Sequence, residues 1–541
     1  MLGLDAICKS TRVAMVGVVT LGLVVGGCTA GGAGGSNASG TVTTAAATPV
    51  TTNPCTAGPK TLESALVSSP ARDDTSVYCF AWQEFVALNW QADPSNPGYP
   101  NPKALPASFG TPGDTSPKVW ESYMEASAVF TATPMKGPMK GTWQAKRPTS
   151  KVLSRTSKFG AADLSDIYQA GSGHHWLTNA RGDLTYYEIM MNRDEYEFIT
   201  TQNLTTAAGQ LACASQPGKY LSDGPPGPPP PGALMRGGLT MPEGQSNGWD
   251  DTDCEGNIKT YGDHVGAMEV KASWTPLPAD HSLDYRYKTA IAEIVDPVTK
   301  ARRQVTVGLV GLHIARKTVA FHQWIWATFE QIDNTPDEAA GGGFVAPTLP
   351  ANPNQKPSPG YTFFDPKCDP KTNAFKCVHN APPTPCPPAP GGTCQPFTAP
   401  MQITRVTPVS ATANGVTAYF WSLLPAKSVF NYYRLVGVQW PTDSGNPLPA
   451  GQRLPLPQGT PSPKGAAGGT AQILADATLE SFQQTQAGCM DCHANYTSIA
   501  SPPGLQAAAK GGLRKVSRVV GGAPQPYASD YSFLFLTETK R

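Results

Sequence analysis

The sequence predicts an α+β fold, with an antiparallel β-sheet-rich core in its second half, peripheral helices and long loops rich in proline and glycine. Three observations lead to this prediction. Runs rich in Val, Ile, Thr and aromatic residues follow one another through 265–332, separated by short turns. Apolar residues occur at helical spacing in short segments such as 78–90. Glycine and proline number 54 each, so about a fifth of the 541 residues favour turns and loops.

The helical segments come first along the chain. Residues 78–90 carry Phe80, Phe85 and Leu88 at helical spacing, with Trp82 and Trp90 close by, which predicts an amphipathic helix. A second helix is expected at 119–129. Residues 184–200 mix strand-like and helix-like signals, so this segment is left unassigned.

The strand signals lie farther along the chain. From 268 to 274 apolar residues alternate with polar ones, which is typical of a strand with one buried face. Further runs at 285–294, 304–314 and 323–332 are short and separated by turns, as in an antiparallel sheet. The run at 432–440 adds another strand.

We therefore divide the chain into five parts. They are a lipoprotein signal peptide at 1–27, a flexible tether at 28–54, an N-terminal α/β region at 55–260, an antiparallel β-rich region at 261–440 and a haem-attachment segment at 441–541 that packs on the β region.

The N-terminus has the features of an export signal. Lys9 and Arg12 precede an apolar run at 13–25, which is too short to span a bilayer comfortably. Two glycines then precede Cys28. This ending resembles the lipobox of bacterial lipoproteins, which implies cleavage before Cys28 and lipidation of its sulfur. The alternative is an ordinary secretory signal. Both interpretations place the protein outside the cytoplasm, and the first anchors it at the periplasmic face of a bacterial membrane, with the outer membrane favoured.

The cysteine count agrees with export. Of 12 cysteines, eight remain after the signal, lipid and CxxCH positions are set aside, and an even number in an exported chain predicts disulfides. Pairing of neighbours gives Cys55–Cys79, Cys213–Cys254 and two bridges within 368–394. A zinc site near His379 is the alternative for the last group. The 41 basic and 40 acidic residues leave no positive excess that would favour a nucleic-acid partner.

One motif carries the chemistry. Residues 489–493 read Cys-Met-Asp-Cys-His, in which Cys489 and Cys492 match the two vinyl groups of one haem and His493 matches its proximal iron ligand. The alternatives are a redox dithiol or half of a zinc site. Asp476 is expected to cap a short helix that leads to the motif. Since the motif occurs once, the sequence predicts one covalent haem c.

The sixth iron ligand does not come from the C-terminus. The 48 residues after His493 contain neither Met nor His, so the distal side is either open or completed by the upstream region. His313 is the first candidate, because it follows a strand-like run of inward-facing positions. His264, Met268 and His322 come next.

Three short segments together with the haem motif resemble a known family. They are Glu269-Val270-Lys271, the aromatic run 324–329 and 530–533, which reads Asp-Tyr-Ser-Phe. Their order is similar to that of the cytochrome c′-beta group, which includes hydroxylamine-oxidising cytochromes. The resemblance covers 265–541 and implies that Lys271 is cross-linked to the haem; otherwise Lys271 is a solvated strand residue. The family domain is smaller, so 55–260 stays unexplained, and the gap between the haem motif and 530–533 is longer here. The whole chain also looks like a group of large exported bacterial single-haem proteins.

Three functions remain open from the sequence. Electron transfer in the periplasm with a redox partner protein is favoured. The first alternative is a haem enzyme or gas-binding protein that acts on a small nitrogen or oxygen species at an open distal site. The second is a structural or binding protein that contains haem. An acidic cluster at 330–338 reads as a solvated turn, with a calcium site as the alternative.

Overall fold

The computed structural model of the chain describes a defined set of residues. They are 54–55, 69–71, 73–130, 143–144, 150–153, 176–214, 239–244, 251–296, 299–339, 342–373, 375, 377–383, 398–440, 473–485, 488–489, 493 and 529–537. All of them belong to one compact unit, residues 47–541.

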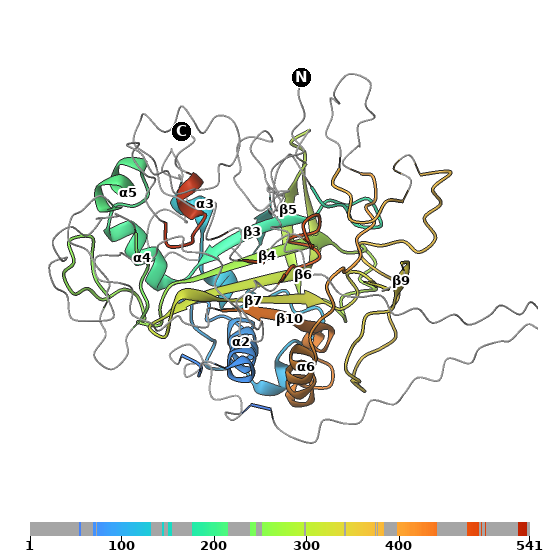
Figure 1. The fold of residues 1–541 in the computed structure, drawn as a ribbon, viewed down its shortest axis with the longest axis horizontal. Helices are drawn as coiled ribbons and strands as arrows, with labels where there is room; N and C mark the ends of the chain where they lie inside the picture. Colours follow the sequence, from blue (N-terminus) through green and yellow to red (C-terminus); the bar gives the residue numbers. More distant parts are fainter. Residues whose placement is uncertain are drawn as a thin grey trace, which may run out of the picture. The chain divides into compact units, whose positions relative to one another are not determined.

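A curled, mostly antiparallel sheet forms the centre of this unit (Figure 1). Among the described residues it has eight strands, in which β3, β4, β6 and β7 are successive neighbours and β10 pairs with β7. The strands are β1 (Met124–Glu125), β2 (Lys151–Leu153), β3 (Tyr186–Met191), β4 (Met268–Pro276), β5 (Thr289–Val295), β6 (Arg302–Thr318), β7 (Phe321–Gln331) and β10 (Tyr433–Gln439). A separate ribbon joins β8 (Asp337–Glu338) to β9 (Phe344–Val345).

The predicted α+β class is confirmed. The predicted strand runs correspond to β4, β5, β6, β7 and β10. The unassigned segment 184–200 is a strand followed by a helix, β3 and then α4 (Arg193–Thr201), and Asn192 caps that helix by accepting the N–H of Glu195. The strands β1, β2 and β3 come from the region 55–260 and share the sheet with the later strands.

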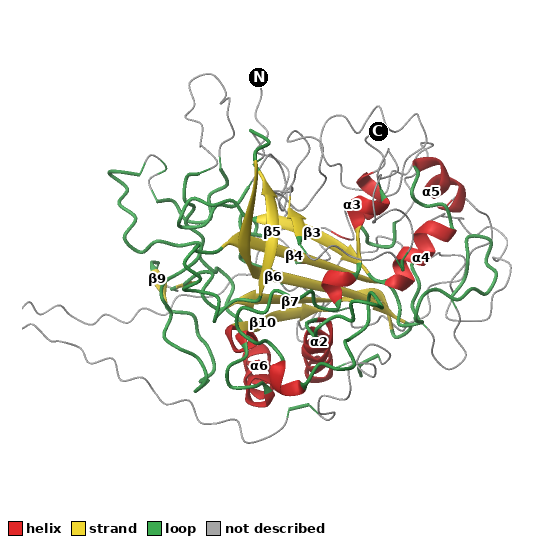
Figure 2. Cartoon of the chain, turned by 180° about the vertical axis from the view of Figure 1, so that it is seen from behind, coloured by secondary structure: helices red, strands yellow, loops and turns green. Residues whose placement is uncertain are grey.

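Two helices cover one face of the sheet beside β7 and β10 (Figure 2). They are α2 (Asp74–Leu88), which Asp73 caps, and α6 (Ala411–Leu423), which Ser410 caps. The ring centroids of Phe85 and Phe329 lie 4.4 Å apart, and those of Trp82 and Phe329 lie 5.2 Å apart. These aromatic contacts stabilise the helix layer by burying large apolar surfaces.

The prediction of one helix at 119–129 is wrong. This segment contains a 3-10 turn at Trp120–Ser122, strand β1 and the four-residue helix α3 (Ala126–Val129). The chain bends here because β1 pairs with β3, and sheet pairing takes precedence over helical spacing in so short a segment. The remaining described helix is α5 (Ala207–Ala214).

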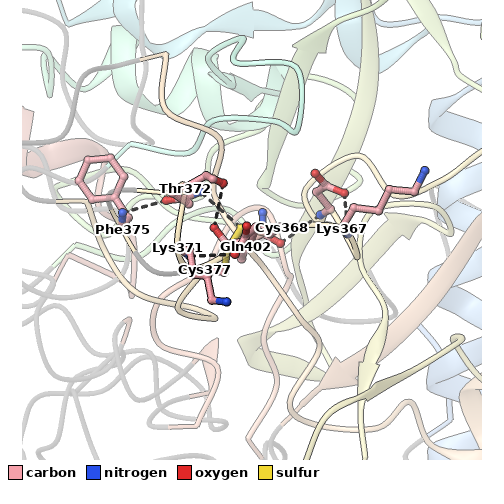
Figure 3. The surroundings of a disulfide bond; sticks show 10 residues. Lys367, Cys368, Lys371, Thr372, Phe375, Cys377 and Gln402 are labelled. Carbon is pink, nitrogen blue, oxygen red and sulfur yellow. Dashed lines mark hydrogen bonds between the residues drawn. A yellow bond between two sulfur atoms is a disulfide. The ribbon is translucent and has the colours of Figure 1, made fainter.

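Disulfide pairing follows the neighbour prediction where it is described. Cys55 bonds to Cys79 and Cys213 bonds to Cys254, as expected. A third bridge joins Cys368 to Cys377 and closes a loop near Gln402 (Figure 3). The zinc alternative thereby loses two of its thiolates. Cys386 and Cys394 lie outside the described residues.

The predicted signal peptide, the tether up to residue 53 and Cys28 also lie outside the described residues. In the part of the chain that is described, no helix has the length and apolar character needed to cross a membrane.

The segment 473–485 covers the second face of the sheet, and its residue Thr478 lies close to Gly311 of β6. A Cβ at Gly311 would lie 2.3 Å from Oγ1 of Thr478 and 2.7 Å from Oγ of Ser273. We therefore expect Gly311→Ala to lower the free energy of unfolding by about 1–3 kcal/mol, because overpacking displaces the covering segment. Urea unfolding measures this change.

The matched control is Gly415→Ala in helix α6. A Cβ there meets nothing within 4 Å, so alanine should raise the stability by up to about 1 kcal/mol through its helix propensity. An unchanged stability in Gly311→Ala would show that the segment 473–485 does not sit on this strand.

Candidate functional site

The candidate site lies on the face of the sheet opposite α2 and α6. Strand register makes Lys271 on β4, His313 on β6 and Thr328 on β7 direct neighbours across three strands. Because successive residues of a strand point to opposite faces, Glu269 and Lys271 share this face, whereas Met268 points to the other. We call this surface of β4, β6 and β7 the polar face.

The segment 473–485 is fixed on the polar face by hydrogen bonds. Oγ of Ser273 lies 2.6 Å from Oγ1 of Thr478, and the hydroxyl of Tyr187 donates to the Thr478 carbonyl at 2.9 Å. The Arg405 guanidinium donates to the Ala475 carbonyl and to the carboxylate of Glu330. The N–H of Ala477 also donates to Glu330, so three strands and one loop hold the segment in place.

The helix expected in this segment is replaced by turns. Asp476 does act as a cap, since its Oδ1 accepts the N–H groups of Thr478 at 2.7 Å and Leu479 at 3.1 Å. The residues that follow, up to 485, form turns and bends. Side-chain and strand partners take up the backbone groups that a helix would have paired.

The second covering segment, 529–537, is held by a buried ion pair. Nζ of Lys317 lies 2.6 Å from Oδ2 of Asp530, and both side chains are 0% exposed. Glu243 lies 3.1 Å from the same ammonium, and the indole N–H of Trp324 donates to Asp530 at 3.1 Å. Burial raises the pKa of Asp530 to about 6, although Lys317 opposes this rise.

The backbone of 529–537 is strained where it approaches the motif. Asp530 and Tyr531 have φ values of 54° and 65°, which non-glycine residues rarely adopt. This conformation is maintained because the Asp530 side chain is locked by Lys317 and Trp324.

His493 is positioned by this strained segment. Its Nδ1 lies 2.6 Å from the Tyr531 carbonyl oxygen. A carbonyl only accepts, so Nδ1 carries the proton and Nε2 carries the lone pair, which is the arrangement typical of histidines that bind metals. The imidazole packs against Trp326 and Phe533, with ring centroids 4.2 Å and 4.7 Å away.

Of the motif cysteines, only Cys489 is described. It is half-buried and packs against the hydrophobic core, and both Cys489 and His493 are in helical conformation. Cys492 lies outside the described residues.

Lys271 is buried, so the interpretation as a solvated residue is wrong. Its side chain lies under the covering segments at 6% exposure, with Nζ 5.5 Å from the centre of the Phe533 ring. Two buried carboxylates, Glu195 and Glu269, interact with its charge. Burial raises the pKa of Glu195 well above its ordinary value and the charge of Glu269 raises it further, while burial raises the pKa of Glu269 against the opposing effect of Lys271.

His313 meets a carboxylate. Its Nε2 lies 3.2 Å from Oε2 of Glu480, and the His313 side chain is 17% exposed. The contact is within ion-pair distance, yet among the described residues Nε2 has no aligned hydrogen-bond partner. The main candidate from the sequence therefore lies on the polar face with Glu480 at its Nε2.

The other candidate iron ligands lie elsewhere. Met268 is on the helix-covered face, where the Tyr123 hydroxyl approaches its sulfur at 3.9 Å. His264 occupies a turn, with φ of 58° and a half-buried side chain. The side chain of His322 lies outside the described residues, as do His174 and His175.

The structure therefore brings four distant segments together. Trp326 contacts His493, His493 contacts Phe533, and Phe533 lies under the ammonium of Lys271. In the sequence these residues were related only by their order. Ionisable groups also lie on or against the same face, among them Glu269, His313 and Glu480.

The acidic cluster at 330–338 is a misinterpreted feature. Glu330, Asp333 and Asp337 are buried rather than solvated. Asp333 accepts two hydrogen bonds from Arg286, at 2.6 and 2.8 Å, and Glu330 pairs with Arg405. Within the described part of the chain, no group of three or more His, Cys, Asp or Glu side chains is placed to hold a metal ion. The arginines that pair with these carboxylates, Arg286 and Arg405, are distant from them in the sequence. No local signal in the sequence therefore predicted the ion pairs.

No protein-family model, curated protein or solved structure matches this chain.

We expect Lys317→Met to lower the free energy of unfolding by about 3–5 kcal/mol, because it leaves the carboxylates of Asp530 and Glu243 buried without their cation. The control is Arg302→Met, which removes an exposed pair with Glu293 and should change stability by about 0–1 kcal/mol. Denaturant unfolding compares the two variants. Equal effects would contradict the role of the buried pair.

Proposed function

We propose that the protein is an exported c-type cytochrome that carries one haem on Cys489 and Cys492, with His493 as the proximal ligand of the iron. The single observation that carries this proposal is the contact between His493 Nδ1 and the Tyr531 carbonyl at 2.6 Å. Buried histidines hydrogen-bond to backbone carbonyls with or without a metal, but this contact leaves Nε2 as the unprotonated nitrogen. A metal-bound histidine needs it, because it fixes the tautomer and the ring orientation.

The surrounding residues fit a haem. The motif supplies two thiols and an imidazole in the required order. Trp326 and Phe533 give the imidazole an apolar setting, which limits solvent access to an attached macrocycle. When bound, a haem supplies redox chemistry and a site for small ligands.

Export is supported by the disulfides. Three bridges lie among the described residues, and structural disulfides persist in oxidising compartments. The basic and apolar N-terminus and the lipobox-like sequence before Cys28 point to the periplasmic face of a membrane.

The function that we favour for the haem is binding of a small exogenous ligand at an open iron position. The polar face beside His493 carries buried or half-buried ionisable groups, among them Lys271, His313 and Glu269. Burying charges is costly, and such groups gather where chemistry uses them. Groups of this kind donate or accept hydrogen bonds with a ligand bound beside them.

Electron transfer is the second candidate function. The pair of His313 and Glu480 also fits a carboxylate that orients a histidine bound to iron through its Nδ1. An iron with two histidine ligands would have no open position and would exchange electrons with a partner protein.

Haem attachment is tested by Cys489→Ser combined with Cys492→Ser, expressed with a cytochrome c maturation system. We expect haem staining after denaturing electrophoresis to be lost, because both thioether bonds are gone. The matched control is Cys368→Ser combined with Cys377→Ser, which removes a disulfide away from the motif and should retain staining. Persistent staining in the first variant would overturn the proposal.

The two functions are separated by the visible spectrum of the dithionite-reduced protein. We expect a high-spin ferrous spectrum that changes at once when carbon monoxide is added, because the 48 residues after His493 contain neither Met nor His and Nε2 of His313 faces Glu480. A low-spin spectrum that carbon monoxide does not alter would support electron transfer instead.

A further inference from the structure

His313 is a hydrogen-bonding side chain whose imidazole lies beside the carboxylate of Glu480. Nε2 of His313 lies 3.2 Å from Oε2 of Glu480. Although Nε2 is buried, no described protein group accepts an aligned hydrogen bond from it. Buried polar atoms ordinarily have a hydrogen-bond partner. A ligand that forms a hydrogen bond with this nitrogen is therefore stabilised.

Both members of the pair have fixed positions. His313 lies within β6, and its backbone pairs with Lys271 on one side and Thr328 on the other. Glu480 accepts the N–H of Asp476 at 2.9 Å through the same Oε2 that faces His313, and its own N–H donates to the Asp476 carbonyl at 2.8 Å. Because both backbones are held by hydrogen bonds, the position of the His313 imidazole is set by its place on β6.

The pair lies close to the motif. Thr328 is the direct neighbour of His313, and Trp326 is the next residue of β7 on the same face, so His313 and Trp326 are diagonal neighbours about 7–8 Å apart. Trp326 in turn contacts His493. His313 and the motif histidine therefore lie over neighbouring residues of the same sheet face.

We propose that His313 is the hydrogen-bond donor to a small ligand held at the sixth position of the iron, and that Glu480 is its positioning residue. This inference rests on the proposed haem and assigns a role to a residue of the same site. The buried ammonium of Lys271, directly across from His313, adds positive charge. The ligands that this arrangement favours are small anions and polar diatomic molecules whose outer atom accepts a hydrogen bond.

Infrared spectroscopy of the ferrous protein with carbon monoxide tests the role. A donated hydrogen bond lowers the C–O stretching frequency, so we expect His313→Leu to shift this band to higher wavenumber. The ferric His313→Leu variant should bind cyanide about tenfold more weakly, which corresponds to the loss of one hydrogen bond. His313→Gln retains a donor and should lie between the wild type and His313→Leu in both measurements.

Glu480→Gln tests the positioning role, and its expected result is a broadened or shifted C–O band with a normal haem content. The matched control is His281→Ala, which removes the exposed pair of His281 with Asp284 and should leave the band unchanged. Should His313→Leu and His313→Gln both bind carbon monoxide with an unshifted band, His313 would not face the ligand.

The remaining outcomes are equally decisive. If the wild type is low-spin and His313→Leu becomes high-spin, His313 is an iron ligand and the inference is overturned. Haem content, measured as the pyridine haemochrome, separates these results from failure of the proposed function itself, because a chain without covalent haem fails that assay in every variant.

Discussion

The buried ion pair of Lys317 and Asp530 is the interaction on which the site depends. The two residues are 213 positions apart and both are fully excluded from solvent. Removing charges from water costs several kcal/mol per ion, so Asp530 is stable in the interior only beside a cation, and Lys317, which Glu243 also contacts, is that cation. The C-terminal segment must therefore return to β6. Its docking places the Tyr531 carbonyl at His493, which means that a structural ion pair sets the orientation of the proposed iron ligand.

The two faces of the sheet differ in the residues that they carry, because different kinds of structure cover them. Helices α2 and α6 cover one face with aromatic side chains and form an ordinary core. Irregular segments from the C-terminal part of the chain cover the other face, where their backbone groups need polar partners. Strand residues such as Ser273 and Glu330 supply those partners. The polar residues of the strands therefore hold the covering segments in place.

The sequence was sufficient for features that depend on local patterns. Alternation identified β4, and neighbour pairing identified Cys55–Cys79 and Cys213–Cys254, because both rest on short separations along the chain. Alternation was misleading about solvent, since a polar residue on a strand is solvated only when its face is open. Lys271 is buried for this reason. Lys317 and Glu330 pair with residues that are far away along the chain, and no local pattern predicts such partners.

The candidate site divides in the same way. The motif around His493 was identified because thioether chemistry requires one fixed spacing, whereas the groups opposite it obey no such rule. His313 was found by its place on a strand, yet the presence of Glu480 at its Nε2 depends on the docking of 473–485. That carboxylate changes the chemistry of the imidazole, because a bond from Nε2 to iron would have to displace Glu480, whereas an N–H at Nε2 can keep the carboxylate beside it and still donate to a small ligand. The β6 backbone is held on both sides, so the ring could move away from Glu480 only by rotation about its side-chain bonds. A fixed donor beside an open iron position requires no such rearrangement, and this difference favours ligand binding over a second histidine ligand.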